Sequence, residues 1–498
     1  MFSPSFKDVE KIAENKQYKR IPVAYELLSD MATPIEVLRI LKGISKHCYM
    51  LESIEDAENW GRYSFLGFDP LLEFTCQNGV VQIKGDSNFT ELNDDLVKIE
   101  TDSPSDIIRD LINKNRSPKI ENFPPFTGGF VGYFAYDYIK YSEPSLNLDA
   151  ENQDQFKDID IMLFDKVIAF DNFRQKIIII VNMKTDDLKN NYKKACDDLK
   201  EIANLIKNGK KADIEPLKLK SDFRNAFSRE KFGDMIVKAK NYIKEGDIFQ
   251  VVLSNRIEAD IEGSLFDTYR VLRTTNPSPY MFYFSSDDIE IAGASPETLV
   301  KVNDNKLYTF PLAGTRPRGK TPQEDLQLEE DLLNDEKELA EHNMLVDLGR
   351  NDIGRIAEIG SVSVDKYMSV ERFSHVMHIG STVSGKLRDD LDCLVALDSI
   401  LPAGTLSGAP KIRACEIINE LENNKRGIYG GAIGYVDLSG NLDTCISIRI
   451  AFKRNNKVFI RSGAGIVADS VPDNEFDECM NKAAAVINAL KIADGGLE

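Results

Sequence analysis

Hydrophobic and polar positions follow two periods along this chain, and the two periods occur in clustered blocks. Apolar runs at adjacent or alternate positions predict strands at Val80–Lys84, Val167–Phe170, Lys176–Met183, Ala432–Val436 and Thr444–Lys453. Apolar positions three and four apart predict helices at Thr33–Lys46, Asp186–Lys207, Arg229–Glu245 and Gln323–Leu348. Because strands and helices cluster and do not alternate strictly, we predict an α+β fold instead of a parallel doubly wound sheet.

A lysine-rich segment interrupts this pattern near the middle of the chain. Ala203–Asp222 is weakly periodic and contains Pro216. With 498 residues the chain is too long for one ordinary core. We therefore predict an N-terminal unit over residues 1–215 and a larger C-terminal unit over residues 223–498.

Charge and composition exclude several classes of partner. The net charge of −19 repels phosphate, so a nucleic-acid or anionic-membrane surface is not expected. The densest apolar run, Ile177–Val181, is far shorter than the roughly 20 residues that span a bilayer. Met1–Arg20 is polar and resembles no signal peptide. The seven cysteines form no CxxC pair, which indicates reduced thiols and a cytoplasmic protein.

Two features near the C-terminus are candidates for binding an anion. In the predicted strand Thr444–Lys453, Arg449 would share a face with Cys445, Ser447 and Ala451. An arginine there needs an anionic partner unless that face is wet, and from the strand alone an exposed edge explains it equally well. The following string, Arg461-Ser-Gly-Ala-Gly465, predicts a glycine turn whose backbone N–H groups can approach an oxyanion.

Acidic faces of two predicted helices are candidates for holding a metal. Glu338 and Glu341 share one face, and Glu475, Glu478 and Lys482 share another. Glutamates brought together from both helices could hold Mg²⁺, which prefers oxygen ligands. Taken singly, either helix is better explained by solvated glutamates.

Other catalytic motifs are missing from the sequence. No HExxH, GxSxG, P-loop or strand-linked GxGxxG occurs. His378 could act as an acid or base, or could be an ordinary core histidine. The residues alone therefore indicate an acidic, soluble enzyme with candidate magnesium and anion sites.

Six strings, taken in order, resemble the chorismate-utilising enzymes, and the resemblance extends over nearly all of residues 228–491. They are GDIFQVVLS (246–254), GASPE (293–297), PLAGTRPRG (311–319), EHNMLVDLGRND (341–352), PAGTLSGAPK (402–411) and RSGAG (461–465). LES (51–53) and GRYSFLG (61–67) resemble the large subunits of the anthranilate-forming branch. This resemblance implies β-sheets packed together with helices on the outside.

The resemblance also implies roles for individual residues. It places Mg²⁺ on Glu341 and Glu478, and it makes Glu297 the acid that protonates the departing ring hydroxyl. His378 matches a histidine of the later step, and Thr405 is grouped with the catalytic residues without an assigned step. The positions that match chorismate-binding residues are Gly314, Thr315, Tyr429, Arg449, Gly463, Ala464, Gly465 and Lys482.

Two positions distinguish branches of the family. Water-adding relatives carry a lysine where this chain has Gln250, and an amide cannot act as a general base. Aminodeoxychorismate synthases usually carry a lysine where this chain has Ala313, which cannot form a covalent bond. Ammonia is therefore the expected nucleophile and anthranilate the expected product. Aminodeoxychorismate synthase is the alternative, and an inactive tryptophan-binding subunit is the alternative from another class.

Regulation and nitrogen supply follow from the same resemblance. Tryptophan, as feedback inhibitor, is expected between Ser53 and the turn that holds Pro279, Tyr280 and Met281. Pro277 and Pro279 are equally compatible with a plain rigid turn. No amidotransferase-like Cys/His/Glu set occurs, so the resemblance implies a separate glutamine amidotransferase subunit as partner.

Overall fold

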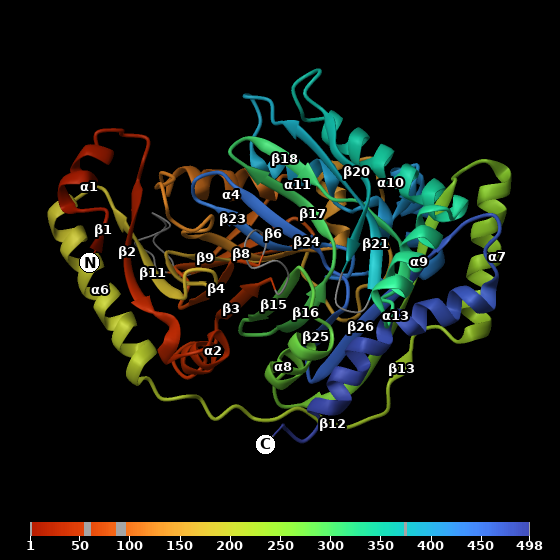
Figure 1. Cartoon of the computed structure of the whole chain (residues 1–498), viewed down its shortest axis with the longest axis horizontal. Coiled ribbons are helices and arrows are strands. Elements are labelled where there is room, and N and C mark those ends of the chain that lie inside the picture. The colour runs from red at the N-terminus through yellow and green to blue at the C-terminus, as the bar shows by residue number, and fades with distance from the viewer. Residues whose placement is uncertain (1, 54–60, 86–95, 373–375, 498) are drawn as a thin grey trace.

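The computed structural model describes residues 2–53, 61–85, 96–372 and 376–497. These residues form two large antiparallel sheets that pack face to face, with helices on the outer faces (Figure 1). The first sheet has 14 strands and the second has 12 among the described residues. The predicted α+β class is confirmed.

The first sheet orders its strands β1 (Phe2–Ser3), β2 (Arg20–Leu28), β11 (Lys176–Lys184), β10 (Lys166–Asp171), β4 (Tyr63–Phe68), β3 (Cys48–Glu52), β15 (Tyr280–Ser285), β16 (Glu290–Ser295), β25 (Ile450–Arg454), β26 (Lys457–Ile466), β14 (Gln250–Glu262) and β12 (Lys218–Leu219). Two short strands, β13 (Arg224–Asn225) and β22 (Gly408–Ala409), also pair with β14.

The second sheet orders its strands β19 (Leu312–Pro317), β21 (Val376–Lys386), β18 (Lys306–Thr309), β17 (Thr298–Asn303), β24 (Leu442–Ile446), β23 (Ala432–Asp437), β8 (Gly129–Phe134), β9 (Ile159–Phe164), β5 (Leu72–Gln77), β6 (Val80–Gly85) and β7 (Leu96–Glu100), and β20 (Ser363–Arg372) pairs with β21. In both sheets, strands from before residue 215 pair with strands from after residue 223, as β3 does with β15 and β8 with β23. The division into two units stays a prediction.

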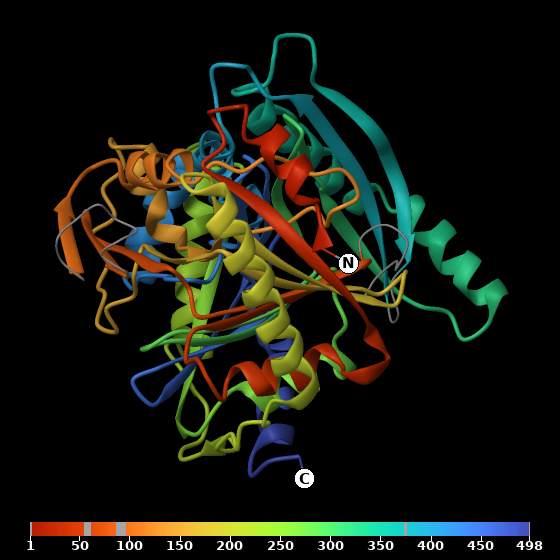
Figure 2. The same ribbon diagram turned by 90° about the vertical axis from the view of Figure 1, so that its left-hand side faces the viewer.

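Helices cover the outer faces of both sheets. The first sheet carries α1 (Phe6–Ile12), α2 (Pro34–Leu41), α6 (Leu188–Asn208), α8 (Phe266–Thr275) and α13 (Pro472–Ala493). The second carries α4 (Pro104–Asn113), α10 (Glu336–Gly354) and α11 (Cys393–Ile400). The remaining helices are α5 (Ile139–Ser142), α7 (Arg229–Glu245), α9 (Pro322–Leu333), α12 (Lys411–Glu422) and the 3-10 turns Ser29–Met31, Tyr136–Tyr138 and Gly404–Leu406. Figure 2 shows α6 running beside β2.

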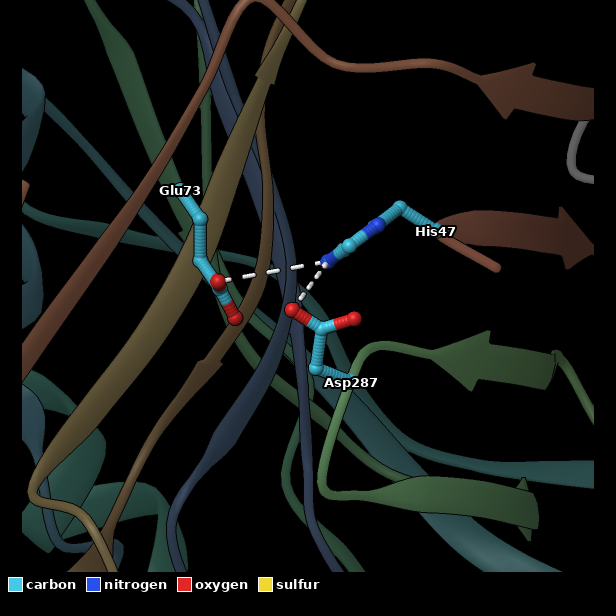
Figure 3. A group of neighbouring side chains, drawn as sticks. All are labelled: His47, Glu73 and Asp287. Carbon is cyan, nitrogen blue, oxygen red and sulfur yellow. Dashed lines mark ion pairs between the residues drawn. The ribbon is translucent and has the colours of Figure 1, made fainter. Parts of the chain in front are cut away.

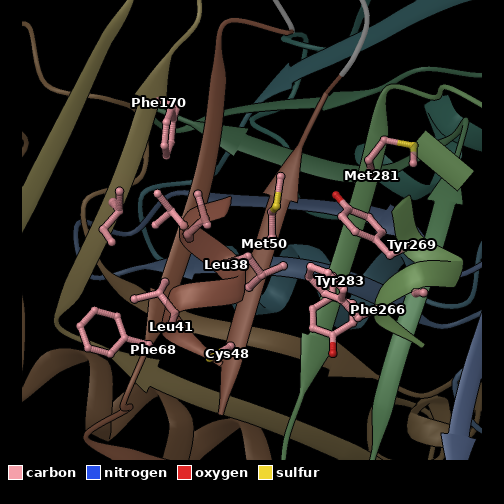
Figure 4. Close-up of a cluster of buried hydrophobic side chains, with 14 of the residues drawn as sticks. Leu38, Leu41, Cys48, Met50, Phe68, Phe170, Phe266, Tyr269, Met281 and Tyr283 are labelled. Atoms are coloured by element: carbon pink, nitrogen blue, oxygen red, sulfur yellow. The ribbon is translucent and has the colours of Figure 1, made fainter. Parts of the chain in front are cut away.

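Strand β15 shows why the central strands lack a polar face. Phe282 and Phe284 point into the core between the sheets, whereas Met281 and Tyr283 point into the core beneath the helices (Figure 4). A strand buried on both faces has apolar residues at consecutive positions. The central strands are therefore fixed in place from two sides, which suits them to position a site.

Several predicted elements are confirmed, and two of the predicted helices differ from the observed ones. Helix α7 has the predicted bounds, and β6, β10, β11 and β23 each lie within one residue of theirs. The predicted helix over Thr33–Lys46 ends at Leu41. The predicted helix over Gln323–Leu348 is two helices, because Asp335 accepts hydrogen bonds from the backbone N–H groups of Lys337 and Glu338 and starts α10 anew.

The helices and the cysteines are expected to show no membrane-spanning segment and no disulfide frame. Among the described helices, none is long and apolar enough to cross a membrane. All seven cysteines are buried and free.

Candidate active site

Arg449 lies where the chain passes from the second sheet to the first. The predicted strand Thr444–Lys453 is wrong, because β24 ends at Ile446 and β25 begins at Ile450. Arg449 between them has a φ of 53°, in the left-handed region. The turn between sheets, which period-2 spacing does not predict, removes Arg449 from the expected strand face. Its carbonyl accepts a hydrogen bond from Ala294 N–H at 3.2 Å, and this bond holds the turn against β16.

Glu297 lies on a second crossing between the sheets, from β16 to β17. Its carbonyl accepts a hydrogen bond from Ile446 N–H at 2.9 Å, which joins the two crossings. Thr405 Oγ1 donates to its carboxylate at 3.2 Å. Burial raises the pKa of Glu297 to about 7, although the Thr405 hydrogen bond and the nearby Arg449 and Lys482 oppose this shift. A substantial share of Glu297 therefore keeps its proton near neutral pH, as a general acid requires.

His378 is held in one tautomer by the neighbouring strand. Its Nδ1 lies 2.9 Å from the carbonyl oxygen of Gly314 and 3.1 Å from Thr315 Oγ1. A carbonyl can only accept, so Nδ1 carries the proton and Nε2 is left as an acceptor. Gly314 has a φ of 67° at an irregularity in the pairing of β19 with β21, and this bend turns its carbonyl toward the ring. Burial lowers the pKa of His378, which favours neutral imidazole.

The predicted glycine turn is a strand instead. Gly463, Ala464 and Gly465 lie within β26 and pair with β14. Gly463 is needed for space, not for a turn, because a Cβ there would lie 2.6 Å from the Leu253 carbonyl oxygen and 3.1 Å from the Tyr429 hydroxyl. A Cβ on Gly465 would meet only the Gln250 side chain, whose Nε2 would lie 2.6 Å away. The two glycines of the RSGAG string therefore mark a strand that neighbouring groups approach closely, and not a turn.

Lys482 connects this strand with the acidic faces of α10 and α13. Its Nζ donates to the carbonyl of Gly463 at 3.3 Å and pairs with Glu478 at 2.7 Å. Burial raises the pKa of Glu341, and the carboxylates of Glu338 and Glu478 raise it further. Glu341 and Glu478 are therefore close enough to repel each other. Two neighbouring carboxylates are a suitable donor set for Mg²⁺.

A cavity of about 930 Å³ opens onto these groups, within the size range of small-molecule sites. Five of the residues predicted for catalysis, chorismate binding or Mg²⁺ binding line it: Thr315, His378, Arg449, Glu478 and Lys482. Pro296, beside Glu297, also lines it. Asn481 and Asp477, to which the sequence patterns assigned no role, line the cavity from α13 beside the acidic face. In the sequence, only their helical spacing from Glu478 and Lys482 could have indicated that they line the site.

A second cavity, of about 380 Å³, brings together Ser53, Pro279, Tyr280 and Met281. The Ser53 hydroxyl is buried and has no hydrogen-bond partner within the described part of the chain. Lys301 and Asp443, an ion pair at 3.0 Å, also line this cavity and carry no signal in the sequence. Pro279 lines both cavities, so one turn separates them.

The sequence matches a known protein family over most of its length. The chorismate binding enzyme family matches residues 46–488, and the chain belongs to that family. It is 44% identical to anthranilate synthase component 1 of Aquifex aeolicus and 45% identical to that of Acetivibrio thermocellus, with 99% of each chain covered. The predicted family is confirmed.

Solved structures show the same fold. Anthranilate synthase component I from Streptococcus pneumoniae superposes with a TM-score of 0.73 at 37% identity, over 92% of this chain and 98% of that one. The menaquinone-specific isochorismate synthase of Escherichia coli, at 19% identity, has a TM-score of 0.67 over 97% of this chain and 98% of that one. The expected fold, packed sheets with helices outside, is confirmed.

Proposed function

We propose that the chain is a cytoplasmic, Mg²⁺-dependent enzyme that converts chorismate and ammonia to anthranilate and pyruvate, the first committed step of tryptophan biosynthesis. One observation carries the proposal: a buried Glu297 with a pKa of about 7 lies beside Arg449 and Lys482. A buried proton donor beside two cations that line one cavity suits a substrate with two carboxylates and a poor leaving group. The full-length relatives named anthranilate synthase component 1 support the same reaction.

The chain's own residues divide the reaction into two steps. Arg449 and Lys482 bind carboxylate, and Glu297 protonates the ring hydroxyl, which leaves as water when ammonia adds to the ring. We assign His378 to the elimination that follows, in which a ring proton is lost and the enolpyruvyl group departs as pyruvate. Mg²⁺ held by Glu341 and Glu478 would supply the positive charge for the remaining substrate carboxylate.

The product from chorismate, Mg²⁺ and an ammonium salt at alkaline pH tests the proposal directly. We expect fluorescent anthranilate and pyruvate in equal amounts, because Gln250 cannot activate water and Ala313 cannot hold the ring covalently. Accumulation of aminodeoxychorismate or isochorismate would replace the assignment with another branch of the family. No turnover at all would favour an inactive tryptophan-binding subunit.

Glutamine should be inert with this chain alone. We propose that ammonia comes from a separate amidotransferase subunit, since the sequence holds no glutaminase motif of its own. Adding that subunit should make glutamine a nitrogen source, measured as anthranilate fluorescence. Glutamine-dependent turnover by the isolated chain would contradict the proposal, and ammonium-dependent turnover in the same preparation is the control.

We propose that the cavity at Ser53 binds tryptophan as a feedback inhibitor. Ser53 offers an unpaired hydroxyl, and Met281 and Tyr280 offer apolar and aromatic walls for an indole. Tyr280 OH lies 3.0 Å from Thr298 Oγ1, and Thr298 directly follows Glu297. A ligand that shifts this strand end would therefore also shift the acid, which couples the two sites.

Ser53→Phe should abolish tryptophan inhibition and leave uninhibited turnover largely intact, because the phenyl ring fills the cavity. Ser53→Ala is the graded comparison. It removes one hydrogen bond, worth about 0.5–1.5 kcal/mol, so the inhibitory concentration should rise by about tenfold at most. Inhibition curves at fixed chorismate measure both effects. Unchanged sensitivity in Ser53→Phe would place the inhibitor elsewhere.

A further inference from the structure

Three side chains converge at the end of β3 that lies away from Ser53. His47 precedes β3, Glu73 lies on β5, and Asp287 lies in the turn between β15 and β16. Figure 3 shows all three pointing toward one another. His47 Nε2 is 3.9 Å from Glu73 Oε2 and 3.8 Å from Asp287 Oδ2, and both distances are too long for hydrogen bonds.

One carboxylate oxygen at this point has no hydrogen-bond partner. Within the described ranges, Glu73 Oε1 is buried and accepts no hydrogen bond, and Glu73 as a whole is only 9% exposed. The nearest ammonium to Glu73, Lys157 Nζ, is 4.0 Å away. A buried carboxylate oxygen without a hydrogen bond is costly unless a cation binds it.

We propose that His47, Glu73 and Asp287 form a binding site for a divalent transition-metal ion of the zinc type. Zinc bonds of about 2.0–2.2 Å at a tetrahedral angle separate ligand atoms by roughly 3.4 Å, so small side-chain rotations would close the site. Imidazole selects such an ion over Mg²⁺ or Ca²⁺, and the two carboxylates match its charge. A pocket of about 250 Å³ beside Glu73 and Asp287 leaves room for a water as the fourth ligand.

Two neighbouring lysines already pair with several carboxylates and therefore determine which of them can bind a metal ion. Lys157 already pairs with Asp160 at 2.9 Å and with Asp288 at 3.0 Å, and Arg454 pairs with Asp288 at 3.2 Å, so both aspartates already have cationic partners. Lys84 holds Asp287 at 2.7 Å, but its side chain is 60% exposed and can move into solvent. Lys84 is therefore the group that competes with the ion for Asp287.

The site would tie the two sheets together. His47 and Asp287 belong to the first sheet, because β3 pairs with β15, and Glu73 belongs to the second. The opposite ends of β3 and β15 reach Ser53 and Tyr280 at the second cavity. The ion's role is structural: it fixes one end of the strand pair whose other end lines that cavity.

Cobalt(II) titration of the chelator-treated full chain, with excess Mg²⁺ present, tests the site. We expect one equivalent to give the visible absorption of tetrahedral Co²⁺, displaced by Zn²⁺. His47→Ala and Glu73→Gln should weaken binding by at least about tenfold. Lys84→Met should tighten it severalfold, because the competing ammonium is gone. The double variant Glu341→Gln/Glu478→Gln should bind Co²⁺ as the parent does.

Each contrary result overturns the proposal. Absence of the tetrahedral spectrum at millimolar Co²⁺, or unchanged binding in His47→Ala, would remove the site. Loss of binding in the Glu341/Glu478 double variant would place the ion on α10 and α13 instead. Should His47→Ala fail to fold, Lys84→Met still decides, because it touches no ligand: unchanged affinity would show that Asp287 does not bind the ion.

Discussion

Replacing Glu297 by glutamine is expected to lower kcat by about 10²- to 10⁴-fold, the usual contribution of a positioned general acid. The amide keeps the shape and the Thr405 contact but has no proton to give to the leaving hydroxyl. Steady-state anthranilate formation at saturating chorismate, Mg²⁺ and ammonium measures the loss. Folding should survive. Because burial raises the pKa of Glu297 from 4.5 to about 7, its ionisation destabilises the fold progressively as pH rises from about 4.5 to about 7 and fully above that range, and glutamine removes this penalty. Turnover within threefold of the parent would exclude Glu297 as the acid.

The pH profile gives an independent check on the same residue. The rate is first corrected for the concentration of unprotonated ammonia, which itself changes with pH. The corrected kcat/KM should fall as pH rises through about 7, because Glu297 then loses its proton. Thr405→Val removes a hydrogen bond that lowers the pKa of Glu297, so this descending limb should move to higher pH. A limb that stays in place in Thr405→Val would mean that another group titrates.

Neutralising either proposed metal ligand is the second large effect expected. Glu341→Gln or Glu478→Gln should lower turnover by at least about 100-fold, because an amide binds Mg²⁺ much more weakly than a carboxylate, and lost charge stabilisation of a few kcal/mol has this size. A rise in the Mg²⁺ concentration needed for half-maximal rate should accompany the loss.

Glu336→Gln is the matched control for this prediction. Glu336 is exposed in the first turn of α10, so its replacement removes the same charge from the same helix. We expect near-parental turnover and an unchanged Mg²⁺ requirement. Near-normal turnover of Glu341→Gln or Glu478→Gln at saturating Mg²⁺ would show that the residue is not a ligand.

Local sequence patterns predicted the bounds of elements that are stabilised by contacts within their own segment. Helix α7 begins after Ser228, whose side chain accepts a hydrogen bond from Lys231 N–H, and ends at Gly246 in the left-handed conformation. Both signals lie within the helix's own sequence, so its bounds could be predicted. Glu341 and Glu478 could be placed on helix faces for the same reason, since helical spacing depends only on the chain itself.

Features that depend on contacts between distant segments could not be predicted. Nothing local marks the turn at Arg449, because it exists only where β24 joins one sheet and β25 the other. RSGAG looked like a turn because a glycine needed for space and a glycine needed for a bend are identical in sequence. The approach of Gln250 and Tyr429 to β26, which separates the two cases, is a tertiary contact.

By itself, the sequence determined the α+β class, the family and the residue types of the site, because periodicity and motif strings are properties of the chain. Only the tertiary structure decided the raised pKa of Glu297, the tautomer of His378 and the position of Pro279 between two cavities. Burial, hydrogen-bond partners and enclosed volume are set by segments hundreds of residues apart. These properties are established only when the two sheets pack against each other.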